Sequence, residues 1–160
     1  MLKKGDAAPN FETTTETGTH FALKDYRGKK LMLFFYPKDN TPGCKAEACS
    51  IRDSYSIFQS NDIPVFGISG GTEKSHHKFS EKNNLPFPLL MDSDHEIAKL
   101  YQVYKPKKLA GREYLGILRI TFLIDEDGKI ESIFGGPEGI DKVKTKVHAD
   151  QVIQFWGLKP

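Results

Sequence analysis

The residues best suited to chemistry in this sequence are its two cysteines, Cys44 and Cys49, which lie in the stretch "FYPKDNTPGCKAEACS". Pro42 and Gly43 come directly before the first cysteine. Proline and glycine favour a turn, so Cys44 is expected in the first turn of a helix that follows. Unpaired backbone N–H groups and the positive end of the helix dipole favour an anion at that position. The pattern therefore predicts a reactive thiolate at Cys44.

The spacing between the cysteines predicts that they cannot bond while this helix is intact. Ideal helix geometry places Cα atoms at i and i+5 roughly 8.6 Å apart, with the side chains about 140° apart around the axis. A disulfide requires Cα atoms within about 7 Å. Either Cys44 and Cys49 never bond, or they bond after the first turns of the helix unwind.

Other kinds of cysteine site fit the sequence less well. A structural disulfide would close a very small loop, which stabilises little and breaks helical hydrogen bonds. A thioredoxin-type exchange site needs CxxC, which is absent. Zinc needs four ligands, and the adjacent His76 and His77 would point to different sides of a helix, so no metal site is expected. Cys49 taken alone is typical of a small buried apolar residue.

Length and composition indicate one globular domain over residues 1–160, with 38% hydrophobic residues. The 23 Lys and Arg are spread among 21 Asp and Glu, so no nucleic-acid partner is expected. The N-terminus lacks the apolar stretch of a secretory signal, and the longest apolar run, residues 31–37, is too short to cross a membrane. A cytoplasmic location follows as the expectation, and there a cysteine pair is more often catalytic or redox-active than structural.

The order of expected elements predicts an α/β fold. Residues 30–37 and 63–69 are continuous apolar runs, which is typical of strands buried on both faces. From Cys44 to Gln59 apolar residues recur at spacings of three and four, which predicts a helix. Thr72 opens another helical segment. Strand, helix, strand, helix indicates a βαβ unit in a parallel sheet.

Hairpins and a closing helix complete the expected elements. Residues 11–23 favour a hairpin around Thr17-Gly18, and residues 118–134 favour a second one around Asp127-Gly128. Residues 148–158 suit a closing helix, with the inward side chains expected to be Val152, Phe155 and Trp156.

The segment "FFYPKDNTPGCKAEACSIRD" closely resembles the active-site segment of the peroxiredoxins, in the bacterioferritin-comigratory-protein or peroxiredoxin Q subfamily. The likeness continues through "GISGGTEKSHHKF", "LPFPLLMD" and "GILRITFLIDEDGKI", and it spans Gly5 to about Trp156. The Pro-x-x-x-Thr-x-x-Cys pattern at residues 37–44 is highly specific. The resemblance implies a thioredoxin-like fold, with a central mixed sheet flanked by helices and an N-terminal β-hairpin. It also implies catalysis without a metal or an organic cofactor.

The resemblance also assigns expected roles to individual residues. Cys44 would be the peroxidatic thiolate, which becomes a sulfenic acid when it attacks the peroxide. Thr41 would hold the sulfur and the peroxide with its hydroxyl, Pro37 would shield the site from water, and Arg119 would stabilise the thiolate and polarise the peroxide. Cys49 would be the resolving cysteine, which forms an intramolecular disulfide with Cys44. A thioredoxin- or glutaredoxin-like protein would then reduce that disulfide.

Two parts of the likeness are weaker. Glu47, Arg52 and Asp53 match the family segment, and they fit equally well as helix charges that steady the site and as charges on a solvated helix face. Residues 135–142, "GGPEGIDK", look like an insertion before the last helix.

Three functions fit the sequence. The leading one is a thiol peroxidase that reduces hydrogen peroxide and organic hydroperoxides. The second is a thiol–disulfide oxidoreductase on the same fold, against which the lack of CxxC argues. The third is a peroxide-responsive redox sensor or holdase with slow turnover. The protein is expected to be a monomer or a weak homodimer.

Overall fold

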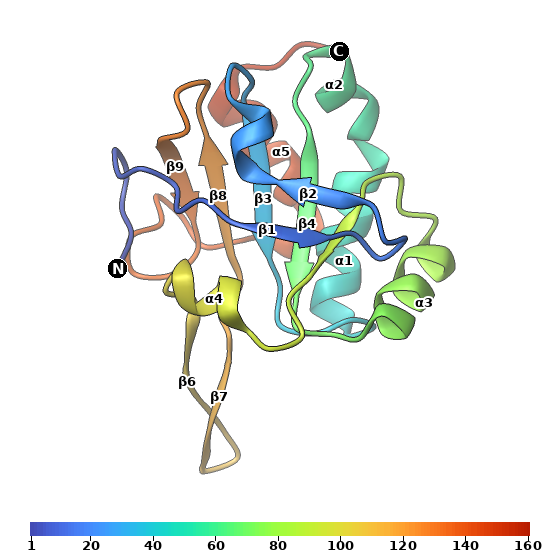
Figure 1. Cartoon of the computed structure of the whole chain (residues 1–160), viewed down its shortest axis with the longest axis vertical. Helices are drawn as coiled ribbons and strands as arrows, with labels where there is room; N and C mark the ends of the chain where they lie inside the picture. The colour runs from blue at the N-terminus through green and yellow to red at the C-terminus, as the bar shows by residue number, and fades with distance from the viewer.

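A computed structural model describes residues 1–160, and its centre is a five-stranded mixed sheet in the order β5-β4-β3-β8-β9 (Figure 1). The strands are β3 (Leu31–Phe35), β4 (Val65–Ser69), β5 (Leu89–Met91), β8 (Ile120–Ile124) and β9 (Ile130–Phe134). Strand β4 pairs in parallel with both β3 and β5, whereas β8 is antiparallel to both β3 and β9. The expected mixed sheet and the β8–β9 hairpin are confirmed.

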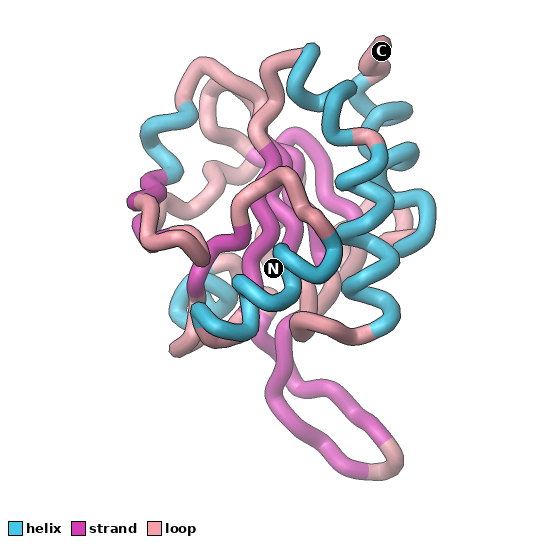
Figure 2. The backbone as a smooth tube through the Cα atoms, turned by 90° about the vertical axis from the view of Figure 1, so that its right-hand side faces the viewer, coloured by secondary structure: helices cyan, strands magenta, loops and turns pink.

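Two more pairs of strands lie outside this sheet. Strands β1 (Glu12–Thr14) and β2 (His20–Ala22) form the expected N-terminal hairpin. Strands β6 (Tyr104–Leu109) and β7 (Arg112–Ile117) form a hairpin that projects from one end of the molecule (Figures 1 and 2). The sequence did not predict the β6–β7 hairpin, because its two strands lack the regular apolar alternation of a half-buried strand.

The helices are α1 (Pro42–Asp53), α2 (Tyr55–Ser60), α3 (Glu73–Asn83), α4 (Glu96–Leu100) and α5 (His148–Trp156), with two 3-10 turns, η1 (Leu23–Tyr26) and η2 (Thr145–Val147). The single helix expected from Cys44 to Gln59 is wrong in its bounds. It begins at Pro42, a residue suited to the first helical position because its missing N–H would have no partner there. It is interrupted at Ser54, whose N–H bonds back to the Ile51 carbonyl at 3.2 Å and closes the last turn of α1.

The apolar run of β3 is explained by a core on each face of the sheet. Leu31, Leu33 and Phe35 face the core beneath the β1–β2 hairpin and α4. Met32 and Phe34 face the core that side chains of α1, α2, α3 and α5 fill. Successive strand residues point to opposite faces, so a strand covered on both sides needs apolar residues at every position.

Helix α5 packs on the sheet with a different set of inward residues from the expected one. Val152 is fully buried and Trp156 is half-buried, but Phe155 is 37% exposed, so its expected inward position is wrong. Consecutive helical residues are about 100° apart, which turns Phe155 away from the side that Val152 and Trp156 define. None of the helices is both long and apolar enough to cross a membrane.

Candidate active site

Cys44 lies in the first turn of α1, as the sequence predicts. Thr41 is the N-cap residue and Pro42 the first residue of this 12-residue helix, which begins just beyond the end of β3. The Lys45 N–H donates to the Thr41 carbonyl at 2.8 Å and closes the first turn around the cysteine. The Cys44 side chain is buried, with the residue 1% exposed. The sulfur therefore lies at the positive end of a helix and is shielded from water.

Arg119 joins Cys44 to a buried carboxylate. Its Nη2 donates to Cys44 Sγ at 3.5 Å, and its Nη1 donates to Glu47 Oε1 at 2.7 Å. Gly43 allows this approach, because a Cβ atom there would lie 2.9 Å from Arg119 Nη2. Burial disfavours the charged guanidinium, but the charges of Cys44 and Glu47 outweigh it and raise the pKa of Arg119. The site therefore holds a cation against the Cys44 sulfur.

Glu47 lies in a buried polar cluster, not on a solvated face of α1, and His148 of α5 is its neighbour. Both residues are 0% exposed, and His148 Nε2 lies 3.8 Å from Glu47 Oε2. His148 Nδ1 lies 2.8 Å from the side-chain amide oxygen Oε1 of Gln151, and Nε2 lies 2.8 Å from the Thr121 hydroxyl. Nδ1 therefore donates and Nε2 accepts in a neutral imidazole. Sequence reasoning missed His148, because only the packing of α5 against α1 brings it to Glu47.

Burial shifts the pKa values of this pair in opposite directions. It raises the pKa of Glu47 to about 7, against the lowering effect of Arg119. It lowers the pKa of His148 to about 4, against the hydrogen bond that His148 Nδ1 donates to Gln151, and the charge of Arg119 lowers it further. Both groups therefore favour their neutral forms in the folded protein over part of the acidic range.

The other two residues expected at the site lie in the loop between β3 and α1. The Thr41 hydroxyl donates to the Lys38 carbonyl at 3.1 Å, so this backbone oxygen engages its proton. Pro37 is half-buried and lies two residues after the end of β3. Both residues are therefore close to Cys44 along the chain, but neither has a hydrogen bond to its sulfur.

Asp39 anchors this loop to α3. The buried Asp39 carboxylate accepts from the Tyr36 hydroxyl at 2.7 Å, from the Ser75 hydroxyl at 2.7 Å and from His76 Nδ1 at 2.6 Å. Burial opposes the ionisation of Asp39, but the hydrogen bonds and the charge of His76 outweigh it and lower its pKa. His76 uses its second nitrogen on the Leu90 carbonyl, so both of its ring nitrogens are engaged in holding the loop.

Cys49 lies further along α1, half-buried, with its Sγ 3.8 Å from Asn83 Oδ1 at the end of α3. Both cysteines are free. The fold therefore brings Arg119 to Cys44. In the intact helix the Cys49 sulfur contacts Asn83 and is not bonded to Cys44.

Comparisons with known proteins agree with this geometry. The profile described as the AhpC/TSA family matches residues 4–133. The chain is 44% identical to Peroxiredoxin Bcp of Bacillus subtilis over 153 residues, which covers 96% of this chain and 94% of that protein. It is 40% identical to Peroxiredoxin Bcp of Escherichia coli over 154 residues, with 96% and 95% covered. The chain belongs to the AhpC/TSA family.

Solved structures place this peroxiredoxin in the Bcp and PrxQ group. Xylella fastidiosa PrxQ superposes with a TM-score of 0.88 at 32% identity, over 98% of this chain and 96% of that one. The Bacterioferritin Comigratory Protein of Xanthomonas campestris, described for its alkyl peroxide reduction activity, superposes with a TM-score of 0.82 at 32% identity, over 92% and 90% of the chains. The expected thioredoxin-like peroxiredoxin fold is confirmed.

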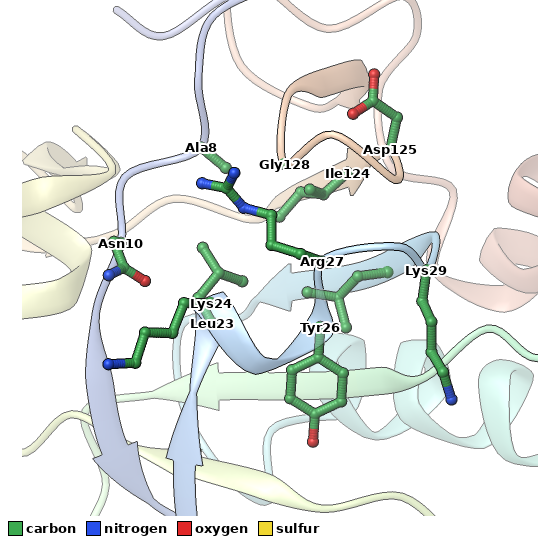
Figure 3. Close-up of a pocket in the computed structure, with 11 residues that line it drawn as sticks. Ala8, Asn10, Leu23, Lys24, Tyr26, Arg27, Lys29, Ile124, Asp125 and Gly128 are labelled. Carbon is green, nitrogen blue, oxygen red and sulfur yellow. The ribbon is translucent and has the colours of Figure 1, made fainter.

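A cavity at the far end of the sheet does not belong to this peroxiredoxin site. Ile124, the last residue of β8, lines this cavity (Figure 3). Leu31, the first residue of β3, also lines it, whereas Cys44 follows the other end of β3. The cavity volume of about 20 Å³ is enough for one water molecule. No group of three or more His, Cys, Asp or Glu side chains is placed to hold a metal ion.

The opposite pKa shifts of Glu47 and His148 predict opposite pH slopes of stability in two variants. A raised Glu pKa stabilises the fold below the unfolded value of 4.5, and this contribution is lost as pH rises through about 7. A lowered His pKa stabilises the fold above the unfolded value of 6.5, and this contribution is lost as pH falls through about 4. Each contribution reaches about 3 kcal/mol at most.

Urea unfolding between pH 4.5 and pH 7 measures these slopes. Relative to wild type, the free energy of unfolding of Glu47→Gln is expected to rise with pH, since only His148 then titrates. That of His148→Gln is expected to fall with pH. Parallel pH profiles for all three proteins would contradict the prediction.

Proposed function

We propose that this peroxiredoxin reduces hydrogen peroxide and organic hydroperoxides, with Cys44 as the peroxidatic residue. The single observation that carries the proposal is the 3.5 Å contact between Arg119 Nη2 and a Cys44 sulfur at the N-terminus of α1. A cation and a helix terminus aimed at one buried sulfur stabilise its thiolate, which is the nucleophile in thiol chemistry.

The chemical step follows from this placement. The Cys44 thiolate attacks the terminal peroxide oxygen, so an S–O bond forms as the O–O bond breaks, and Cys44 becomes a sulfenic acid. The leaving oxygen takes a proton and departs as water or an alcohol. Arg119 lies where negative charge moves from the sulfur to the leaving oxygen, and its planar fork can hold Glu47 and the reacting atoms together.

Thr41 and Pro37 are assigned supporting roles in this proposal. Because the Thr41 proton is directed to the Lys38 carbonyl, lone pairs of the Thr41 hydroxyl oxygen are free to accept a hydrogen bond from the peroxide. Pro37 has no N–H and presents an apolar ring, which limits the access of water to the sulfur.

Cys49 is proposed as the resolving residue. Its thiol attacks the Cys44 sulfenic acid, expels water and leaves an intramolecular disulfide. The geometry of α1 requires its first turns to unwind for this step, and Glu47 must then leave its buried position between the two cysteines. A thioredoxin- or glutaredoxin-like dithiol protein reduces the disulfide and closes the cycle.

Intact mass measured under non-reducing conditions tests both cysteines. After one equivalent of hydrogen peroxide, the wild-type protein is expected to lose two hydrogens within seconds. Cys49→Ser is expected to gain one oxygen on the same timescale, because its sulfenic acid has no partner thiol. Unchanged masses would show that Cys44 is not activated, and the same two-hydrogen loss in Cys49→Ser would assign the resolving thiol to another molecule.

Residues 1–160 are proposed to form one thioredoxin-like domain. The protein is proposed to work in the cytoplasm, where dithiol reductants are available. The protein is proposed to act as a monomer or weak homodimer, without nucleic acid or a membrane. Support comes from the two cores, which share one central sheet, and from the even spread of charge in the sequence.

A further inference from the structure

The β6–β7 hairpin has no part in the peroxide chemistry, although it is built next to it. It projects from the end of the molecule where β3 and β4 end and α1 begins (Figure 1). Its second strand ends at Ile117, two residues before Arg119. It carries four cations, Lys105, Lys107, Lys108 and Arg112, and only one carboxylate, Glu113, in a chain whose formal net charge is +2.

Most of this charge lies on one face of the hairpin. The register pairs Lys105 with Gly116, Lys107 with Tyr114 and Leu109 with Arg112. Directly paired residues of an antiparallel ladder point to the same face, and so do residues two apart on one strand. We call the surface formed by Lys105, Lys107, Leu109, Arg112 and Tyr114 the cationic face.

The cationic face also exposes large apolar groups. Leu109 is 69% exposed and Tyr114 is 45% exposed. Lysine and Pro106 protect exposed strand edges against aggregation, but an exposed leucine and tyrosine have the opposite effect. Cations around aromatic and aliphatic side chains are typical of a surface that binds an acidic protein partner.

Lys107 links the cationic face to the reactive sulfur. Its half-buried side chain lies along the hairpin, and its Nζ donates to the Ile117 carbonyl at 3.1 Å. Gly116 makes room for it, because a Cβ there would lie 2.9 Å from Lys107 Cδ. Ile117 is two residues before Arg119, whose guanidinium contacts the Cys44 sulfur at 3.5 Å. The cationic face therefore begins at the active site.

We propose that the cationic face docks an acidic surface of the dithiol protein that reduces the Cys44–Cys49 disulfide. The inference rests on the proposed function, in which this reductant is the one macromolecule that must approach the site. Each hairpin strand of six residues extends roughly 20 Å, far beyond the size of a peroxide. A surface of that length beside Cys44 suits a protein that must hold its own thiol against the disulfide.

The docked step is a balanced thiol–disulfide exchange. One thiolate of the reductant attacks a sulfur of the Cys44–Cys49 disulfide, so a mixed disulfide forms and the other cysteine leaves as a thiolate. The second thiol of the reductant then attacks the mixed disulfide. The reductant ends as a disulfide, and this protein receives two electrons and two protons as two thiols.

The test is a single-turnover measurement on the pre-formed disulfide. It is mixed at low ionic strength with reduced thioredoxin of net negative charge, and the second-order rate constant is measured. The charge-reversed variant is Lys105→Glu with Arg112→Glu. The matched control, Lys24→Glu with Lys129→Glu, makes the same charge change at exposed positions at the opposite end of the sheet.

The charge-reversed variant is expected to lose about tenfold or more in this rate constant, and the loss is expected to shrink as salt screens the charges. The control is expected to lose much less. Reduction by dithiothreitol, and oxidation by hydrogen peroxide, are expected to stay at wild-type rates in both. Tyr114→Ala is expected to slow the reduction of the disulfide by thioredoxin severalfold without changing its salt dependence, because the substitution removes an apolar contact.

Three results would overturn the docking proposal. One is that thioredoxin reduces the disulfide of the charge-reversed variant, of Tyr114→Ala and of wild type with the same rate constant. Another is an equal loss with dithiothreitol, which would place the effect inside this protein. The third is a change from dimer to monomer in the variant, which would make the face a contact between copies. Failure of the wild type to form the disulfide would instead contradict the proposed function.

Discussion

Cys44→Ser is expected to abolish peroxide reduction, with a loss of at least about 10⁵-fold, because enzymes exceed uncatalysed rates by about 10⁶-fold or more. A serine hydroxyl is not ionised at neutral pH, so Arg119 would face a group that cannot act as the nucleophile. The measurement is the rate of hydrogen peroxide consumption with dithiothreitol as the reductant, which removes any dependence on a protein partner.

Cys49→Ser is the matched control for this variant. It changes the other cysteine of α1 and is expected to keep the first reaction with peroxide at the wild-type rate. A Cys44→Ser protein that still consumes peroxide at more than a trace rate would remove Cys44 from the peroxidatic role. Circular dichroism of both variants separates a loss of chemistry from a loss of folding.

Arg119→Ala is expected to slow the reaction of Cys44 with peroxide by about 10²- to 10³-fold, the usual effect of removing one fixed donor to a developing charge. The variant loses the contact to Cys44 Sγ and leaves the buried Glu47 without its ion-pair partner. Stopped-flow oxidation in a single turnover measures this step alone.

Arg112→Ala is the control for Arg119, because it removes an arginine of the neighbouring hairpin that has no contact with the sulfur. Its oxidation by peroxide is expected to match wild type. Arg119→Lys keeps the charge but not the planar fork, so its rate is expected to lie between those of Arg119→Ala and wild type. If Arg119→Ala reacts at the wild-type rate, Arg119 has no role in the chemical step.

Features that depend on neighbouring residues were readable from the sequence. Pro42 and Gly43 placed Cys44 at a helix N-terminus through turn preferences, and the structure has it there. The apolar runs of β3 and β4 predicted buried strands, because a strand covered on both faces needs apolar residues throughout. The apolar neighbours of Arg119 indicated a paired, partly buried arginine, and the resemblance to a known family supplied its expected role at the sulfur.

Features that depend on packing were decided only by the tertiary structure. Arg119 lies 75 residues from Cys44 in sequence, and only the packed fold brings its guanidinium to the sulfur. Gly43 is needed there because a Cβ atom at this position would lie 2.9 Å from Arg119 Nη2. The sequence left Glu47 equally as a charge that steadies the site and as a charge on a solvated helix face, and the structure buries it beside His148 of α5.

The β6–β7 hairpin was not predicted because most of its residues are exposed, so its sequence carries no pattern of a buried face. Local backbone preferences act within a few residues, so the sequence alone determined where Cys44 lies on its helix. Burial and long-range contacts exist only after the elements pack, so the tertiary structure decided which charges surround its sulfur.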